Sequence, residues 1–343
     1  MTSIVFMGTP QFAVPVLEGL LKQAYDVKAV VTQPDRPVGR KHRLTASPVK
    51  EVAVKNNIEV LQPEKISGSE EMKRVIDLAP DLIVTAAYGQ FLPSKLLNSA
   101  KIAAINVHGS LLPKYRGGAP VQYSLMNGDD KTGVTLIYMV KKMDAGEMLG
   151  QAELPITMSD DTGSLFEKLS FLGRDLLLAK LPALIAGNLN STPQNEDEVV
   201  FAPTIKPEEE QLLLSLTAEQ IDWKVRALRP APGAFFENFA GKRTKLWNVD
   251  PLEKRTEQAA GTIIEVTKHQ LTVAAAKGTV YQINELQPAG KQRLTVTDYL
   301  NGLNQKLEKG QVLIAGPNKS KELKRVIADL KNEGTELILV DGA

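Results

Sequence analysis

The sequence predicts a two-domain protein, in which an α/β, Rossmann-like N-terminal domain with a mainly parallel sheet precedes a C-terminal OB-like β-barrel. Short apolar runs alternate with helical stretches in the first half, which is typical of βαβ units. Five short strand-like runs follow one another later in the chain. Between the two lies a segment rich in Asn, Ser, Thr and Pro that lacks periodicity. We expect domains at residues 1–189 and 208–313, a linker at 190–207, and a C-terminal extension of unknown role at 314–343.

The N-terminal domain is expected to start with a buried strand at residues 4–7 and a helix at 10–24. Further strands are predicted at 27–32, 81–85, 103–107 and 134–139. A long helix at 161–188, with a stripe of leucines on one side, closes the domain. Because ligands of such sheets usually bind at the carboxyl ends of the strands, we look for functional residues there.

The C-terminal domain is expected to open with a helix after Thr217, where Gln220 three residues on completes a capping box. The five strand-like runs cover residues 234–239, 244–249, 261–266, 270–274 and 280–286. Their number and spacing favour a small barrel such as the OB-fold. The extension contains an amphipathic helical pattern at 320–332 and a strand-like run at 337–340.

Composition narrows the possible chemistry. The 343 residues include no cysteine, which excludes disulfides, thiolate nucleophiles and cysteine metal sites. No basic region precedes the first apolar segment and no apolar run is long enough to span a bilayer, so we expect a cytoplasmic protein. The formal net charge is +1, but residues 224–293 hold twelve Lys/Arg against six Asp/Glu, a local charge of +6. This half therefore looks suited to a polyanion.

Histidine chemistry has few candidates, because the chain contains three histidines. His108 ends the apolar run at residues 102–107, and Asn106 lies two positions before it. Side chains at i and i+2 of a strand share a face, so an amide and an imidazole can converge on one carbonyl oxygen and stabilise charge that develops there. The alternative is that both side chains merely satisfy loop backbone at a strand end.

A second candidate element is the loop at residues 139–146, where Asp144 precedes Gly146 after another strand. A carboxylate there can accept a proton from an attacking amine, directly or through water, and can orient the imidazole. The alternative is a local Asx turn.

The first large loop carries a compact positive tip, since Arg36, Arg40, Lys41 and Arg43 stand against the single Asp35. Such a tip can neutralise phosphates, although a solvated surface loop is the alternative. Four aromatic residues of the C-terminal half can stack on nucleotides, although aromatics in such strands are more often core: Trp223, Phe235, Phe236 and Trp247.

Taken together, four motifs resemble the formyltetrahydrofolate-dependent formyltransferases: NVHGSLLP at 106–113, RG at 116–117, TGVT at 132–135 and DAG at 144–146. The resemblance implies that Asn106, His108 and Asp144 match the catalytic trio of the family. It implies a folate-contacting loop made of Ser110, Leu111, Leu112 and Pro113. The run QFLP at 90–93 resembles the segment that lines the pterin pocket.

Further motifs resemble the members of this family that act on charged tRNA: GTPQFA at 8–13, QPDRPVGR at 33–40 and LQPAGK at 286–291. In those members the first large loop enters the acceptor end of the tRNA, which implies tRNA contacts by Arg40, Lys41 and Arg43. The resemblance covers residues 4–313. It implies transfer of the formyl group of 10-formyltetrahydrofolate to methionine on initiator methionyl-tRNA, without a metal, by a monomer.

Two other functions stay open from the residues themselves. The acceptor can be a small amine, such as a sugar nucleotide or a purine precursor, with the barrel as a structural part. The chain can also be an OB-type nucleic-acid-binding protein without catalysis. NAD binding is disfavoured, because GTPQFA lacks the second and third glycines of the dinucleotide fingerprint. No His/Asp/Glu cluster has the spacing of a metal site.

Overall fold

The computed structural model describes residues 1–38 and 42–315. The chain forms two compact units. The first comprises Met1–Ser124 with Asp129–Thr204, and the second comprises Leu125–Gly128 with the chain from Ile205 onward. Within the described residues, no helix has the length and apolar character that crossing a membrane requires.

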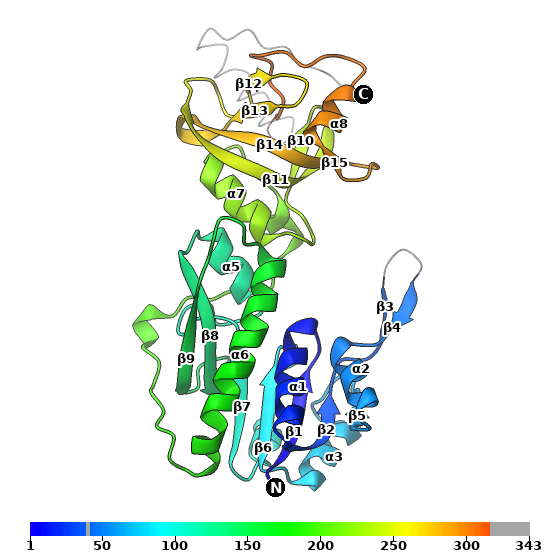
Figure 1. The fold of residues 1–343 in the computed structure, drawn as a ribbon, viewed down its shortest axis with the longest axis vertical. Helices are drawn as coiled ribbons and strands as arrows, with labels where there is room; N and C mark the ends of the chain where they lie inside the picture. The colour runs from blue at the N-terminus through cyan, green and yellow to red at the C-terminus, as the bar shows by residue number, and fades with distance from the viewer. Residues whose placement is uncertain (39–41, 316–343) are drawn as a thin grey trace. The chain divides into compact units, whose positions relative to one another are not determined.

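The first unit is built on a seven-stranded sheet in the order β5-β2-β1-β6-β7-β8-β9 (Figure 1). Five neighbouring strands run parallel: β5 (Glu59–Leu61), β2 (Asp26–Val31), β1 (Ser3–Gly8), β6 (Leu82–Ala86) and β7 (Ala103–His108). The last two, β8 (Lys131–Tyr138) and β9 (Met148–Pro155), are antiparallel. The predicted mainly parallel, Rossmann-like sheet is therefore confirmed.

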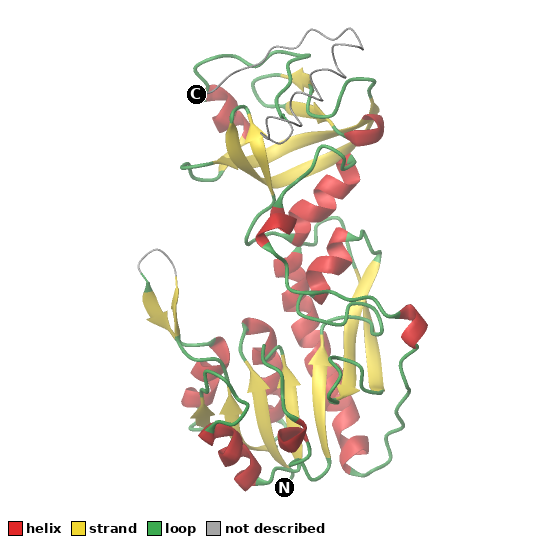
Figure 2. Ribbon diagram, turned by 180° about the vertical axis from the view of Figure 1, so that it is seen from behind, coloured by secondary structure: helices red, strands yellow, loops and turns green. Residues whose placement is uncertain are grey.

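Helices cover both faces of this sheet (Figures 1 and 2). On one face α1 (Val14–Lys22), preceded by the 3-10 turn η1 (Gln11–Ala13), lies beside α6 (Thr162–Ile185). On the other, α3 (Glu70–Leu78) and α4 (Ser94–Leu97) contribute Val75 and Leu96 to a core with Val5 and Ile83. The remaining helices are α2 (Pro48–Lys55) and α5 (Pro120–Met126). The strand order reverses between β1 and β6, the point at which ligands usually bind in open α/β sheets.

A two-stranded hairpin, β3 (Arg36–Val38) and β4 (Arg43–Thr45), stands away from the sheet (Figure 1). Its base is fixed by polar contacts, since Lys50 Nζ lies 2.7 Å from Asp35 Oδ2 and Gln62 donates a 2.8 Å hydrogen bond to Asp35 Oδ1. Arg36 pairs with Glu64. The loop predicted to carry a positive tip includes these two strands, and its residues 39–41 lie outside the described residues.

Residues 190–204, expected to be part of a linker, belong to the first unit and contact its sheet and loops. Thr192 forms an isolated bridge with Met148 of β9, and Phe201 forms one with Arg116. The 3-10 turn η2 (Glu196–Glu198) lies between these bridges. The segment lacks periodicity because its backbone is held by loops and side chains rather than by a regular element.

The second unit contains a sheet in the order β10-β11-β14-β13-β12, with β15 paired to β14. Its strands are β10 (Phe235–Phe239), β11 (Lys242–Arg255), β12 (Ile263–Val266), β13 (Leu271–Ala274), β14 (Thr279–Pro288) and β15 (Leu294–Thr295). Its helices are α7 (Ala218–Ala227) and α8 (Val296–Asn301), with 3-10 turns η3 (Pro207–Glu210) and η4 (Ala276–Gly278). The predicted capping box of Thr217 and Gln220 begins α7. The five predicted strand runs match β10 to β14.

Residues 310–315 join the two edges of this sheet. The Leu313 N–H donates to the Gly261 carbonyl beside β12 at 2.9 Å, and the Leu313 carbonyl accepts from the Ala240 N–H beside β10 at 2.7 Å. Leu313 and Ile314 are buried in the core of the unit. The sheet therefore closes into the expected barrel through a segment that the sequence did not single out. The helix and strand predicted at 320–332 and 337–340 lie outside the described residues.

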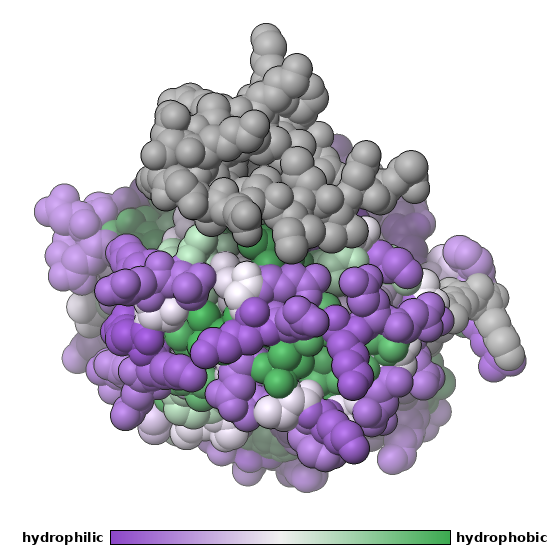
Figure 3. All heavy atoms as spheres, turned by 90° about the horizontal axis from the view of Figure 1, so that it is seen from above, coloured by the Kyte–Doolittle hydropathy of each residue, from purple (hydrophilic) through white to green (hydrophobic). Residues whose placement is uncertain are grey.

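Phe235, Phe236 and Trp247 are buried, which supports the core interpretation of these aromatics. Cations lie over the rings of Phe235 and Trp247. The Arg243 guanidinium lies 3.6 Å from the Phe235 ring centroid, and Arg293 lies 5.4 Å from that of Trp247. The face seen in Figure 3 is hydrophilic over most of its uncovered area, with small apolar patches between the polar side chains.

Candidate active site

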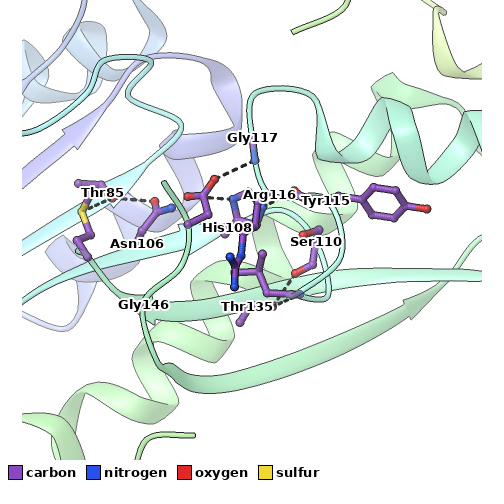
Figure 4. A network of polar contacts seen from close by, with 12 residues as sticks. Thr85, Asn106, His108, Ser110, Tyr115, Arg116, Gly117, Thr135 and Gly146 are labelled. Carbon is purple, nitrogen blue, oxygen red and sulfur yellow. Dashed lines mark hydrogen bonds and ion pairs between the residues drawn. The ribbon is translucent and has the colours of Figure 1, made fainter. Parts of the chain in front are cut away.

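Asn106 and His108 occupy the carboxyl end of β7, next to the carboxyl end of β6. The two side chains reach toward the same region, as their spacing on the strand requires (Figure 4). The His108 side chain is 6% exposed, and Asn106 is half-buried. The strand end thus presents an amide and an imidazole together, with the imidazole almost completely buried.

The Nε2 atom of His108 lies 2.9 Å from the backbone carbonyl oxygen of Tyr115. Because a carbonyl oxygen can only accept, we assign the proton to Nε2. The Nδ1 atom faces the carboxylate of Asp144, whose Oδ1 is 3.7 Å away. One ring nitrogen therefore satisfies loop backbone, and the other is left for chemistry beside a carboxylate.

Asp144 lies in the loop between β8 and β9 and is 15% exposed. Its Oδ2 accepts a 3.0 Å hydrogen bond from the Gly117 N–H, so the carboxylate serves a distant loop instead of a local Asx turn (Figure 4). Its φ of 49° is in the left-handed region, which Asp tolerates better than most residues. Gly146 is required nearby, since an added Cβ would lie 1.8 Å from the Tyr138 carbonyl oxygen. The two loops singled out in the sequence therefore meet at one point.

Thr85 of β6 orients the amide of Asn106, its register partner on β7. The Thr85 hydroxyl lies 2.7 Å from Asn106 Oδ1 and donates to it. This contact leaves the amide N–H groups of Asn106 to face the site. Sequence reasoning missed Thr85, although the polar hydroxyl in an otherwise apolar strand was the available signal.

The loop formed by Ser110, Leu111, Leu112 and Pro113 is separated from β7 by Gly109 alone. Ser110 and Leu112 are buried, and the Ser110 hydroxyl donates to the Lys114 carbonyl at 2.7 Å. Thr135 of β8 donates to the Ser110 carbonyl and accepts from the Leu112 N–H. Thr135 thus fixes the backbone of the loop from β8. The Leu111 and Pro113 side chains are partly exposed.

The segment at residues 90–93 follows β6 and is anchored at its first residue. Gln90 Oε1 accepts from the Ile66 N–H at 2.8 Å, and Gln90 Nε2 donates to Gln33 Oε1 at 3.3 Å. Leu92 is buried, whereas Phe91 is 59% exposed. The segment therefore offers one large exposed apolar side chain after the carboxyl end of β6, the strand next to β7.

Arg116, which belongs to the RG motif at 116–117, is completely buried. Its guanidinium donates to Gln194 Oε1 and pairs with Glu196 at 2.8 Å. Hydrogen bonds lower the pKa of Glu196 to about 2, with the larger effect from Arg116 and a smaller one from Lys142. No local pattern indicates this network, because the residues that pair in it are 54 to 80 positions apart.

Of the three residues predicted to contact tRNA, Arg43 is exposed on β4, and Arg40 and Lys41 lie outside the described residues. No group of three or more His, Asp or Glu side chains suited to a metal occurs among residues 1–38 and 42–315.

Comparisons with known proteins agree with these features over both units. Residues 1–181 match the family model described as formyl transferase, and residues 204–304 match the model of the formyl transferase C-terminal domain. Methionyl-tRNA formyltransferase of Ligilactobacillus salivarius is 68% identical over 314 residues, which cover 92% of this chain and 99% of the relative. The protein of the same name from Enterococcus faecalis is 59% identical over 313 residues, with 91% and 100% coverage.

Solved structures show the same fold at low identity. An N-formyltransferase from Helicobacter canadensis, solved with folinic acid and dTDP-3-aminofucose, has a TM-score of 0.63 at 18% identity, covering 84% of this chain and all of that one. HypX from Aquifex aeolicus, solved with tetrahydrofolic acid, has a TM-score of 0.59 at 17% identity, covering 90% of this chain and 50% of that one.

Proposed function

This chain belongs to the formyl transferase family, and from that premise we propose that it transfers a formyl group from a folate carrier to methionine on initiator methionyl-tRNA. The observation that carries the proposal is the meeting of Asn106, His108 and Asp144 at the carboxyl end of β7. An amide donor, an imidazole and a carboxylate are the groups that acyl transfer to an amine needs.

We propose 10-formyltetrahydrofolate as the cosubstrate, with its formyl oxygen directed at Asn106 and at Nδ1 of His108. The methionine nitrogen attacks the formyl carbon, and negative charge develops on the oxygen. Since Nε2 is engaged by the Tyr115 carbonyl, His108 donates from Nδ1 in its protonated form, with the carboxylate of Asp144 as counter-ion. Fixed donors stabilise this charge more than the ground state.

The remaining steps move one proton and break one bond. The attacking amine loses a proton to Asp144, directly or through water. The bond between the formyl carbon and the folate nitrogen then breaks, and that nitrogen takes the proton from Asp144 as tetrahydrofolate leaves. The new bond joins the formyl carbon to the methionine nitrogen, so no oxidant or metal is consumed.

The loop of Ser110, Leu111, Leu112 and Pro113 is proposed to contact the folate. Support comes from its position close after His108 in the chain and from Thr135, which holds it from β8. Because Ser110 and Leu112 are buried, they shape the loop, and Leu111 and Pro113 supply the contact surface. Exposed Phe91 suits the flat face of a pterin ring.

The tRNA is proposed to contact the β3–β4 hairpin, through Arg40, Lys41 and Arg43, and three cations of the barrel. On the barrel, Arg243, Lys245 and Arg293 lie over the rings of Phe235 and Trp247. Each phosphate that these cations neutralise adds to the salt dependence of binding.

One assay tests the function. Radiolabelled formyl transfer from 10-formyltetrahydrofolate is measured with charged initiator tRNA, free methionine and a small sugar amine as acceptors. We expect methionyl-tRNA to be the preferred acceptor, and Asn106→Ala or His108→Ala to lose about 100- to 1000-fold in rate. Equal use of free methionine, or tRNA binding without any change in the folate, would reject the proposal.

A second assay separates the tRNA contacts from the chemistry. Arg40→Ala should raise KM for methionyl-tRNA and make binding less sensitive to salt, while folate binding stays as it is. An unchanged KM in this variant would remove the hairpin from the tRNA interface.

A further inference from the structure

We propose that Gln194 is a positioning residue for formyl transfer, because its side-chain amide holds the loop that presents Asp144 to His108. The proposal rests on the proposed function and assigns a part in it to the segment that the sequence suggested was a linker. Gln194 itself is half-buried and need not touch either substrate.

The amide of Gln194 uses both of its ends. Nε2 donates to the backbone carbonyl oxygens of Asp144 and Gly146, each at 2.8 Å. Oε1 accepts from Arg116, at 3.0 Å from Nε and 2.8 Å from Nη2. Fixing these two carbonyls fixes the backbone around Asp144, which holds a left-handed conformation that is costly for a residue other than glycine.

Arg116 ties this contact to the imidazole. Its chain neighbours supply the two backbone groups of the site, since the Tyr115 carbonyl accepts from His108 and the Gly117 N–H donates to Asp144. The buried guanidinium of Arg116 in turn holds Gln194. Gln194 therefore locks the loop at 144–146 to the loop at 115–117, on which His108 also depends.

A merely structural role would also explain an amide with four hydrogen bonds, and the two roles differ in what they change. If Gln194 acts through the carboxylate, its loss lowers kcat and has little effect on KM for the folate. The loss also disappears once the carboxylate itself has been removed, because residues that act as one unit are not additive. A general loss of stability would lower the rate equally in both backgrounds.

The variant Gln194→Glu separates the two ends of the amide. It keeps an acceptor for Arg116 but has no donor for the carbonyls of Asp144 and Gly146. Gln194→Met, of similar length, removes all four hydrogen bonds. The matched control is Asn195→Ala, since Asn195 is the exposed neighbour and its Oδ1 accepts from the Asp197 N–H at 3.2 Å.

All rates are measured on methionyl-tRNA and normalised to folded protein by thermal unfolding. We expect kcat to fall about 10- to 100-fold in both Gln194 variants, as a small displacement of a reacting group does, and to stay unchanged in Asn195→Ala. In the Asp144→Asn background the same Gln194 changes should cost little more. Wild-type kcat in Gln194→Glu and Gln194→Met, or a full additional loss in the Asp144→Asn background, overturns the proposal. Failure of the unmodified protein to formylate methionyl-tRNA would instead reject the proposed function.

Discussion

Replacing Asp144 by Asn changes the charge beside the imidazole while preserving the shape of the side chain. The amide oxygen can still accept from the Gly117 N–H, as Oδ2 of Asp144 does at 3.0 Å. The amide nitrogen then faces Nδ1 of His108, where Oδ1 now lies at 3.7 Å. The imidazolium of the proposed mechanism then loses its counter-ion, and its Nδ1 faces another N–H donor instead of a carboxylate.

The size of the effect follows from this distance. Unit charges at the 3.7 Å separation of Nδ1 and Oδ1 attract each other by about 4.5 kcal/mol at an effective dielectric constant near 20. This value is a ceiling, because both groups also lose hydration. Loss of one donor to a developing oxyanion typically costs about 100- to 1000-fold in rate, and we expect that fall in kcat. KM for the folate should change little, since the contact strengthens only in the transition state.

Single-turnover formyl transfer to methionyl-tRNA measures the chemical step directly. The matched control is Asp161→Asn, because Asp161 accepts from the Ser164 N–H at the start of α6, where Asn caps a helix equally well. A rate for Asp144→Asn near that of the wild type, with Tm unchanged, would refute the role given to the carboxylate.

Three further outcomes concern stability. Because the pKa of Glu196 is lowered from 4.5 to about 2, its stabilising contribution is complete above pH 4.5 and is lost as the pH falls toward 2. In urea unfolding, the difference in the free energy of unfolding between wild type and Glu196→Gln should shrink over that range. A difference that stays constant would contradict this prediction. Gly146→Ala should destabilise the protein by about 2 kcal/mol or more in thermal unfolding, since its new Cβ would lie 1.8 Å from a backbone carbonyl oxygen. Gly109→Ala, with no atom closer than 3.7 Å to the added carbon, should cost much less. A chain ending at Lys309 should lose several kcal/mol of barrel stability relative to one ending at Ala315, because it lacks two buried side chains and the hydrogen bonds at the sheet edges. Equal Tm values for the two chains would show that the barrel does not need this closure.

The strands of both units were predictable because burial leaves a local mark. Runs such as residues 4–7 and 103–107 are apolar over the length of a buried strand, and the structure places β1 and β7 there. The same holds for β10 to β14, because each of these strands coincides with one of the five strand-like runs of the sequence. Spacing on a strand likewise predicted that Asn106 and His108 share one side, because that relation depends on two positions in one element.

The parts that were missed depend on residues far apart in the chain. Thr85 matters through its register with Asn106 on a neighbouring strand, and Gln194 matters because its segment returns to the Asp144 loop. The closure of the barrel by residues 310–315 depends on backbone hydrogen bonds, which every residue except proline can donate. None of these contacts leaves a periodic pattern in the sequence.

By itself the sequence determined the order of the elements, the two kinds of sheet and the identity of the amide, imidazole and carboxylate, since each follows from local composition or from the spacing of neighbouring residues. Only the tertiary structure decided that the carboxylate lies 3.7 Å from the imidazole, which imidazole nitrogen faces it, and that Gln194 and Arg116 hold the two loops together. These features arise from contacts between segments that meet only once the sheet has formed, and the hydrogen bonds that fix them can be supplied from almost any place in the chain.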